Sequence, residues 1–405
     1  MLPLMLPLNW QRVRLGDMTT SFTKQTGFDY SAFIKPTLIK EYLPNYIPFI
    51  QNKDFLGHYI NYKTDYFIPN EIAIRFPQIL LNEKCLLISI SGAIGNVAVF
   101  NHSQDAFTGG AIAVLKFKEK KSLDFVMHFL MSASGQKLLL NGVKSSSHKN
   151  LTIADLRDLL IPLPPLNEQI AIANILSGLD RYLCALDALI LKKESVKKSL
   201  SFELLSQRKR LKGFNQAWQR VRLGDIGKPC MCKRVMKHQT TRYGEIPFYK
   251  IGTFGNTADA FISKKLFLEY RTKYSFPKKG DILISASGTI GKAVIYDGKP
   301  AYFQDSNIVW IDNDETLVKN DFLFYAYSNV KWNTEHTTIL RLYNDNFRNT
   351  LIPLPPLNEQ SAIANVLSAL DNEIISLKNK KRQFENIKKA LNHDLMSAKI
   401  RVLEK

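Results

Sequence analysis

Three charged residues have the spacing of a nuclease metal site. Asp105, Glu119 and Lys121 form an Asp…Glu-x-Lys arrangement, in which carboxylate oxygens could bind a divalent cation. The 405-residue chain contains 36 Asp and Glu beside 55 Lys and Arg, so one such arrangement is expected by chance. We therefore do not interpret it as a catalytic centre.

Cysteine spacing does not indicate a metal centre either. Cys230 and Cys232 are one residue apart, and His238 is the nearest residue of another ligand type. A structural zinc site would need a second pair of ligands, and four cysteines are too few for a disulfide scaffold. The sequence also lacks a Gly-x-Gly-x-x-Gly or Walker-type phosphate loop and an Asn-Pro-Pro-aromatic segment. We predict reduced thiols, no metal and no catalytic site.

The net charge points to a partner instead. The formal charge is +19, and 45% of the residues are hydrophobic, which is enough for packed cores. Phosphates release counterions when Lys and Arg approach them, so nucleic acid is the expected partner. No stretch approaches the ~20 apolar residues that span a bilayer, and the short apolar N-terminus, with prolines at positions 3 and 7, is not a typical signal peptide. We expect no membrane partner and a cytoplasmic location.

An internal repeat organises the whole chain. Its two outer motifs are Trp-Gln-Arg-Val-Arg-Leu-Gly-Asp and Ile-Pro-Leu-Pro-Pro-Leu-Asn-Glu-Gln, and a Ser-Gly-x-Ile-Gly turn lies between them. The paired segments are 10–17 with 218–225, 87–95 with 283–291, and 161–169 with 352–360. The offset falls from 208 to 191, so the first copy is 17 residues longer. Identical boundaries around diverged interiors indicate different ligands on a common frame.

Each copy is expected to contain a globular part followed by a long helix. Short apolar runs with turn residues predict strands in the globular parts, and the prolines that follow enforce an extended entry to the helix. We predict an α+β fold with a pseudo-two-fold repeat. Its segments are a first globular domain at 1–160, a central long helix at 161–213, a second globular domain at 214–351 and a C-terminal long helix at 352–405.

Both helices carry a coiled-coil pattern. We expect Asn167 and Asn358 to be N-caps, with Glu168 and Glu359 in the first turn. The helices should extend over 167–212 and 358–402 and pair antiparallel as a spacer between the two domains. The apolar seam falls at Ile172, Leu176, Leu179, Leu183, Leu186, Ile190, Leu200 and Leu204, and at Ile363, Leu367, Leu370, Ile374, Leu377, Phe384, Leu391 and Leu395. Lys193, Lys197, Lys381 and Lys388 interrupt it.

The chain resembles the specificity subunits of type I restriction–modification systems. The resemblance rests on the twin Pro-Leu-Pro-Pro-Leu-Asn-Glu-Gln segments with their helices, and the Trp-x-x-Val-x-Leu-Gly-Asp starts and the Ser-Gly-x-Ile-Gly turns add to it. It implies two target recognition domains that each read one half of a split, asymmetric DNA site. It further implies a non-catalytic chain whose helices set the spacing and dock two methyltransferase subunits. Restriction subunits would join them, and S-adenosylmethionine, ATP and magnesium would belong to those partners.

Base readout requires Arg or Lys for guanine, Asn or Gln for adenine, and Ser or Thr for either. Such residues are expected on loops of the recognition domains. Our DNA-binding candidates in the first domain are Ser89, Ser91, Lys144, Ser145, Ser146, His148, Lys149 and Asn150. In the second domain they are Lys250, Ser285, Ser287, Lys292, Gln304, Arg341, Asn344 and Asn346. Family members tend to carry an Asn-Leu pair where this chain has Asn150-Leu151, and Arg341-Leu342 departs from it.

Three other functions fit parts of the sequence. A recognition subunit of a related system that cuts on both sides of its site would share the whole pattern. An RNA-binding protein could use the Gly-x-x-Gly turns, which we interpret instead as tight turns between strands. A coiled-coil scaffold would need no nucleic acid and would show little salt dependence of DNA binding.

Overall fold

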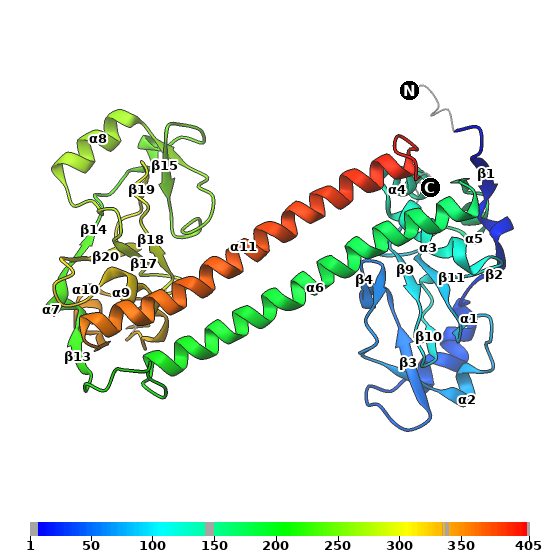
Figure 1. Ribbon diagram of the computed structural model, residues 1–405, viewed down its shortest axis with the longest axis horizontal. Helices are drawn as coiled ribbons and strands as arrows, with labels where there is room; N and C mark the ends of the chain where they lie inside the picture. Colours follow the sequence, from blue (N-terminus) through cyan, green and yellow to red (C-terminus); the bar gives the residue numbers. More distant parts are fainter. Residues whose placement is uncertain (1–6, 142–149, 334, 337–339, 403–405) are drawn as a thin grey trace. The chain divides into compact units, whose positions relative to one another are not determined.

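The structure is a computed structural model that describes residues 7–141, 150–333, 335–336 and 340–402. It divides into two compact units: unit 1 contains 1–187 and 380–405, and unit 2 contains 188–379. Each unit combines sheets with a part of each of two 40-residue helices, α6 (Leu166–Leu205) and α11 (Leu357–Met396) (Figure 1). The fold is therefore α+β, as the sequence predicts.

Unit 1 contains two four-stranded sheets. Strands β2 (Thr19–Lys24), β11 (Ile112–Phe117), β8 (Cys85–Ser89) and β9 (Val97–Phe100) form the first sheet in that order, and all its pairs are antiparallel. The second has the order β6 (Phe67–Pro69), β3 (Tyr46–Ile50), β10 (Ala106–Thr108) and β7 (Leu80–Leu81), with β3 and β10 parallel. Strands β4 (Phe55–Leu56) and β5 (Tyr59–Ile60) form a hairpin.

Helices cover the first sheet of unit 1. Side chains of α3, of β8 and of the first turns of α6 belong to one cluster of buried apolar residues. The other face of β8 contributes to a second buried cluster, shared with β3 and β10. Both faces of β8 are thus covered. The helices of this unit are α1 (Gly27–Asp29), α2 (Asn70–Ala73), α3 (Leu123–Met131), α4 (Ala133–Asn141) and α5 (Ile153–Arg157).

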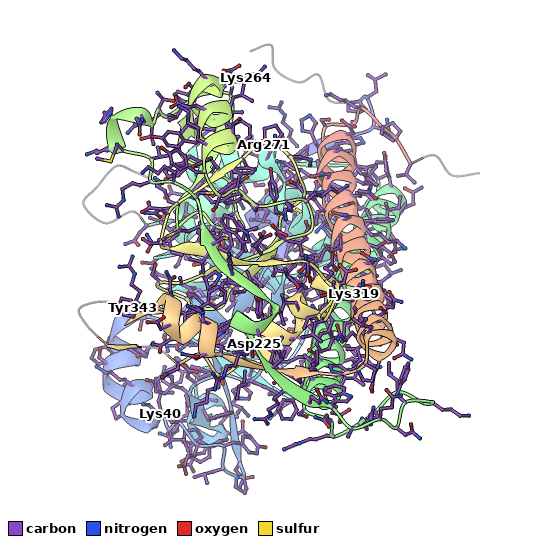
Figure 2. The ribbon with its side chains drawn as sticks, turned by 90° about the vertical axis from the view of Figure 1, so that its left-hand side faces the viewer. Lys40, Asp225, Lys264, Arg271, Lys319 and Tyr343 are labelled. Atoms are coloured by element: carbon purple, nitrogen blue, oxygen red, sulfur yellow. The ribbon has the colours of Figure 1, made fainter. Side chains whose placement is uncertain are left out.

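Unit 2 repeats this plan in a shorter form. Its antiparallel sheet has the order β14 (Gly227–Met231), β20 (Ile308–Asn313), β17 (Ile282–Ser285) and β18 (Ala293–Ile295). A second sheet orders β16 (Phe261–Ile262), β15 (Ile246–Tyr249) and β19 (Tyr302–Phe303), and β15 pairs in parallel with β19. The helices are α7 (Leu223–Ile226), α8 (Lys264–Lys273), α9 (Asn320–Ala326) and α10 (Asn344–Asn349). Figure 2 labels Asp225 on α7 and Tyr343 just before α10, two helices that pack together.

The two outer repeat motifs pair with each other in each unit. Strand β1 (Gln11–Arg14) runs antiparallel to β12 (Leu160–Leu163), and β13 (Gln219–Arg222) runs antiparallel to β23 (Leu351–Leu354). The registers match, because Gln11 lies opposite Leu163 and Gln219 lies opposite Leu354. The start of each globular part is thus hydrogen-bonded to the segment that enters the long helix. This pairing explains why the two motifs recur together.

The long helices pair antiparallel within each unit, because rising residue numbers in α6 meet falling numbers in α11. In unit 1 the partners are Asp180 with Lys388 and Asp187 with Lys381. In unit 2 the partners are Lys193 with Glu373 and Lys197 with Asp371. All four lysines that interrupt the apolar seam therefore neutralise an acid on the other helix. None of the predicted seam residues is exposed.

Both helices end earlier than the sequence predicted. Helix α6 ends at Leu205 and α11 at Met396, whereas the apolar pattern suggested ends at 212 and 402. Gln207 and Ala398 have φ of 61° and 55°, and this left-handed conformation stops a helix. The predicted N-caps are also wrong by two positions. Asn167 and Asn358 lie inside the first turn, where each side chain accepts a hydrogen bond from the next backbone N–H at 2.9 Å.

Candidate nucleic-acid interface

The two Ser-Gly-x-Ile-Gly segments are the same tight turn, as the sequence predicts. They join β8 to β9 and β17 to β18. Gly92 and Gly95 have φ of 74° and 84°, and Gly288 and Gly291 have φ of 66° and 82°, a region that glycine enters without strain. The Gly95 amide donates to the Ser89 carbonyl at 3.0 Å, and the Gly291 amide donates to the Ser285 carbonyl at 2.9 Å.

A second segment is attached to each turn by the same backbone contact. Ser91 forms an antiparallel bridge with Asn150, and Ser287 forms one with Arg341. The next residue anchors the segment in both units: the Leu151 amide donates to Ile90, and the Leu342 amide donates to Ala286, at 3.0 and 2.8 Å. Asn150 and Arg341 therefore occupy the same place in the two frames.

Polar side chains surround this place in unit 2. Asn307 lies just before β20, and its Oδ1 accepts a hydrogen bond from the Ser287 hydroxyl at 2.8 Å. The Arg341 guanidinium donates to the same oxygen at 3.4 Å and to the Ser306 hydroxyl at 3.0 Å. Arg341 belongs to β22 (Leu340–Arg341), where it lies opposite Glu335 of β21 (Glu335–His336), a residue whose side chain the structure does not describe. The cluster presents a cation held by neutral acceptors.

The other candidates of unit 2 lie on adjoining loops. The Gln304 side chain accepts from the Ile251 amide at 2.9 Å and so joins the loop after β15 to the loop after β19. Lys250, in the first of these loops, pairs with Asp259 at 2.8 Å. The Lys292 ammonium donates to the Phe254 carbonyl, so its contact to this loop is internal. Asn344 is exposed at the start of α10, and Asn346 is half-buried in the same helix.

Three of the predicted contact residues, Ser89, Ser285 and Ser287, are buried. Ser89 and Ser285 expose 0% and 2% of their surface, and both hydroxyls bond within their own turn. Both serines lie in covered strands rather than on the exposed loops expected of contact residues, because apolar clusters cover both faces of β8 and of β17. Ser287 exposes 8% and its hydroxyl is bonded to Asn307, so it too acts inside the frame. Ser91 is half-buried, and Asn150 is exposed.

Five predicted contact residues cannot be placed, and one residue of the candidate interface was not predicted. Lys144, Ser145, Ser146, His148 and Lys149 lie outside the described residues. Sequence reasoning missed Asn52, whose side-chain amide donates to the Ser91 carbonyl at 2.7 Å. It follows β3 as Ile251 follows β15. Both strands contain the tripeptide Ile-Pro-Phe (47–49 and 246–248), which is the sequence signal that could have marked the loop after each strand.

Helix α8 is a basic surface that the sequence analysis did not single out. It carries Lys264, Lys265, Arg271 and Lys273 against a single acid, Glu269, and all five residues are exposed. Figure 2 labels Lys264 and Arg271 on this helix. The corresponding helix of unit 1, α2, has the sequence Asn-Glu-Ile-Ala and no basic residue. The basic residues of α8 are spread over the helix without a motif, so only the net charge of the chain pointed to them.

The candidate metal sites of the sequence are not assembled in the described part of the chain. No group of three or more His, Cys, Asp or Glu residues there could bind a metal ion. Burial raises the pKa of the Cys232 thiol to about 12, so this thiol is protonated at neutral pH. No helix in this described part of the chain combines the length and the apolar character needed to span a membrane.

The turn of unit 2 should tolerate no side chain at Gly291. A Cβ there would lie 2.1 Å from Trp332 Nε1, and the residue has a positive φ. We expect Gly291→Ala to lower the free energy of unfolding of unit 2 by about 1–3 kcal/mol, measured by urea denaturation. Gly252→Ala is the matched control, because a Cβ at Gly252 meets nothing within 4 Å. Equal stability of the two variants would contradict this account of the turn.

The comparisons with known proteins agree with this architecture. Residues 7–194 and 215–386 match the family model of the type I restriction modification DNA specificity domain, one match for each copy of the repeat. The chain therefore belongs to this family. It is the non-catalytic specificity subunit of a type I restriction–modification system.

Named relatives come from bacteria and archaea. A putative type I restriction enzyme specificity subunit of Haemophilus influenzae is 42% identical over 70% of this chain and 71% of its own length. The MjaVIII specificity subunit of Methanocaldococcus jannaschii is 25% identical over 98% of this chain and 95% of its own. The fold is similar to the crystal structure of the S subunit from M. genitalium, with a TM-score of 0.61 and 17% identity over 98% of this chain and 99% of that one.

Proposed function

We propose that each recognition domain reads one half of a bipartite, asymmetric sequence in double-stranded DNA. The observation that carries this proposal is the common frame with different side chains on it. The turn, the bridge and the anchoring leucine are the same in the two units. The residue before the leucine differs, because it is Asn150 in unit 1 and Arg341 in unit 2. Two readers with different side chains on one frame suit two unlike half-sites.

We further propose that the helices dock two methyltransferase subunits and set the distance between the half-sites. Repeated ion pairs support this. Glu168 pairs with Arg401 in unit 1, and its repeat counterpart Glu359 pairs with Arg210 in unit 2. Asp180 with Lys388 and Asp371 with Lys197 repeat in the same way. A helix pair whose internal contacts recur in this manner suits two identical partners bound with pseudo-two-fold symmetry.

The chemistry is assigned to the partner subunits. In this proposal the methyltransferase subunits bind S-adenosylmethionine and methylate adenine, and the restriction subunits use ATP and magnesium. The chain itself holds no cofactor and acts in the cytoplasm, where the host DNA lies. A related system that cuts on both sides of its site differs in its partner subunits, so it is distinguished by which subunits co-purify.

The test is to purify the chain with its cognate methyltransferase subunits and to map methylated adenines by single-molecule sequencing. We expect methylation at one split sequence, which is lost when the chain is omitted. Methylation without the chain, or methylation with no sequence preference, would falsify the proposed function. A competition between duplex DNA and RNA of the same sequence should favour the DNA.

We assign phosphate contact to the basic side chains of α8 and expect it to appear in the salt dependence of binding. Each phosphate contact adds about −0.9 to the slope of log affinity against log salt concentration. Lys264→Gln with Lys265→Gln should therefore make the slope of the assembled complex less steep by about 2. The control is Lys299→Gln, an exposed lysine of the same unit that pairs with Asp297. An unchanged slope in the α8 variant would exclude α8 from the phosphate contacts.

A further inference from the structure

The residue before the anchoring leucine contributes its backbone to the frame, and its side chain lies outside the core. In both units the leucine makes the backbone hydrogen bond and is buried, at 3% exposure for Leu151 and 4% for Leu342. The preceding side chain lies outside the core: Asn150 is exposed and Arg341 is half-buried. The frame thus fixes the backbone at positions 150 and 341 and leaves the side chain variable.

The two side chains at this place differ in the bases they can recognise. An asparagine amide both donates and accepts, which matches the N6 and N7 groups of adenine. An arginine presents a fork of donors, which matches the O6 and N7 acceptors of guanine. The surrounding turns have the same backbone geometry in the two units. A difference in readout would therefore come from the side chain.

We propose that this position reads a base: Arg341 a guanine in the half-site of the second domain, and Asn150 an adenine in the half-site of the first. The inference rests on the proposed function and deepens it. It assigns one base contact in each half-site to a single structural position.

The surroundings of Arg341 favour a base over a phosphate. Ser306 and Asn307 hold one guanidinium nitrogen, Nη2, at 3.0 and 3.4 Å, so the planar group is oriented before DNA arrives. Orientation matters for a bidentate pair with a base edge and matters little for a point-charge contact to phosphate. Both acceptors are neutral, so the charge of Arg341 is not cancelled by them. Because both donor forks of a guanidinium include Nη2, a bidentate pair with guanine would replace at least one of these two hydrogen bonds.

The test uses the chain assembled with its methyltransferase subunits, acting on a DNA library in which both half-sites are randomised. Methylated adenines are mapped for the wild type, Arg341→Gln, Asn150→Ala and the control Arg242→Gln. Arg242 is an exposed arginine of the same unit, so the control removes an equal charge. Methylation rates at the wild-type sequence and the melting temperatures of all variants are measured alongside.

We expect Arg341→Gln to lose the preference for guanine at one position of one half-site, by about 10- to 100-fold. Asn150→Ala should relax an adenine at one position of the other half-site, and Arg242→Gln should leave the motif unchanged. Each variant should have the melting temperature of the wild type. A single-base change in the opposite half-site, or in both halves, would overturn the assignment.

The remaining outcomes are also decisive. A uniform loss of methylation over all sequences by Arg341→Gln, with a less steep salt dependence, would show a phosphate contact and refute base reading. An unchanged motif in Arg341→Gln would refute it as well, while the split motif of the wild type would leave the proposed function intact. A wild-type complex without any split motif would overturn the proposed function itself, and this inference with it.

Discussion

Arg210→Met should lower the free energy of unfolding of unit 2 by about 3–5 kcal/mol, because it leaves a buried carboxylate without its cation. The Glu359 side chain is 1% exposed, and Arg210 donates to its two oxygens at 3.1 and 2.6 Å. Trp218 adds one donor at 2.9 Å, which cannot replace a full charge. The measurement is urea denaturation followed by tryptophan fluorescence, since Trp218, Trp310 and Trp332 belong to unit 2.

Neighbouring variants separate the buried charge from other effects of the change. Lys209→Met removes the adjacent cation, whose pair with Glu203 is largely exposed, and should cost at most about 1 kcal/mol. In the double variant Arg210→Met with Glu359→Gln, the buried group is neutral, so part of the lost stability should return. If Arg210→Met costs as much in the Glu359→Gln background as in the wild type, the uncompensated charge is not the cause.

This pair also shows where prediction from sequence stops. The repeat placed Glu168 and Glu359 at the starts of the helices, and their expected role was to favour the positive helix end. Their partners Arg401 and Arg210 follow the ends of α11 and α6, so each contact is known only once the antiparallel register is known. The same holds for Lys193, Lys197, Lys381 and Lys388, which looked like interruptions of a seam. In the antiparallel register each of these lysines forms an ion pair with an acidic residue of the other helix.

The fold was predictable because its signals are local and occur twice. The apolar spacing identified the helix faces correctly, and the repeated motifs marked the strands β1, β12, β13 and β23 that close each globular part. Helix ends were less predictable, since they depend on the left-handed residues Gln207 and Ala398, which no turn motif marks.

The sequence predicted the positions of the tight turns in the candidate interface. It did not predict which side chains near these turns are exposed. Ser89 and Ser285 were predicted as contacts because they flank the glycine turns and because serine can bond to a base. Apolar clusters on both faces of β8 bury Ser89 instead. The near-continuous apolar run from Cys85 to Ile88 is typical of a strand with both faces covered, and it was the signal against an exposed Ser89. Arg341 was weighed against Asn150 as a departure from a family pattern. The repeat offset of 191 residues already aligned Arg341 with Asn150, and the two bridges confirm that the positions are equivalent.

Unit 1 should lose stability as the pH falls below 6.5, because it buries a neutral histidine. His128 in α3 is 1% exposed, and its Nε2 lies 3.0 Å from the Ser177 hydroxyl. Burial lowers the pKa of His128 from 6.5 to about 3, and the nearby charges of His58 and Lys388 act in the same direction. Burial also lowers the pKa of His58, although Asp180 at 3.2 Å opposes this shift.

The sign follows from proton uptake. Between pH 6.5 and about 3 the unfolded chain protonates this histidine and the folded chain does not, so acid favours unfolding. Stability is fully present above pH 6.5 and falls by about 1.4 kcal/mol per pH unit for one histidine, or about 2 kcal/mol by pH 5. In unit 2 the corresponding residue is Tyr325, whose hydroxyl donates to Asp371 at 2.8 Å and does not titrate in this range. The acid response of this position should therefore be confined to unit 1.

Hydrogen exchange of the amides in α3, Leu123–Met131, measures this response within unit 1, once it is corrected for the pH dependence of intrinsic exchange. We expect the opening free energy of these amides to decrease from pH 7 to pH 5 in the wild type. His128→Gln should flatten this dependence, because glutamine takes up no proton and still offers a hydrogen-bonding group to Ser177. His238→Gln, at an exposed histidine of unit 2, should leave the wild-type slope unchanged. A slope in His128→Gln equal to that of the wild type would show that this buried histidine does not govern the acid stability of unit 1.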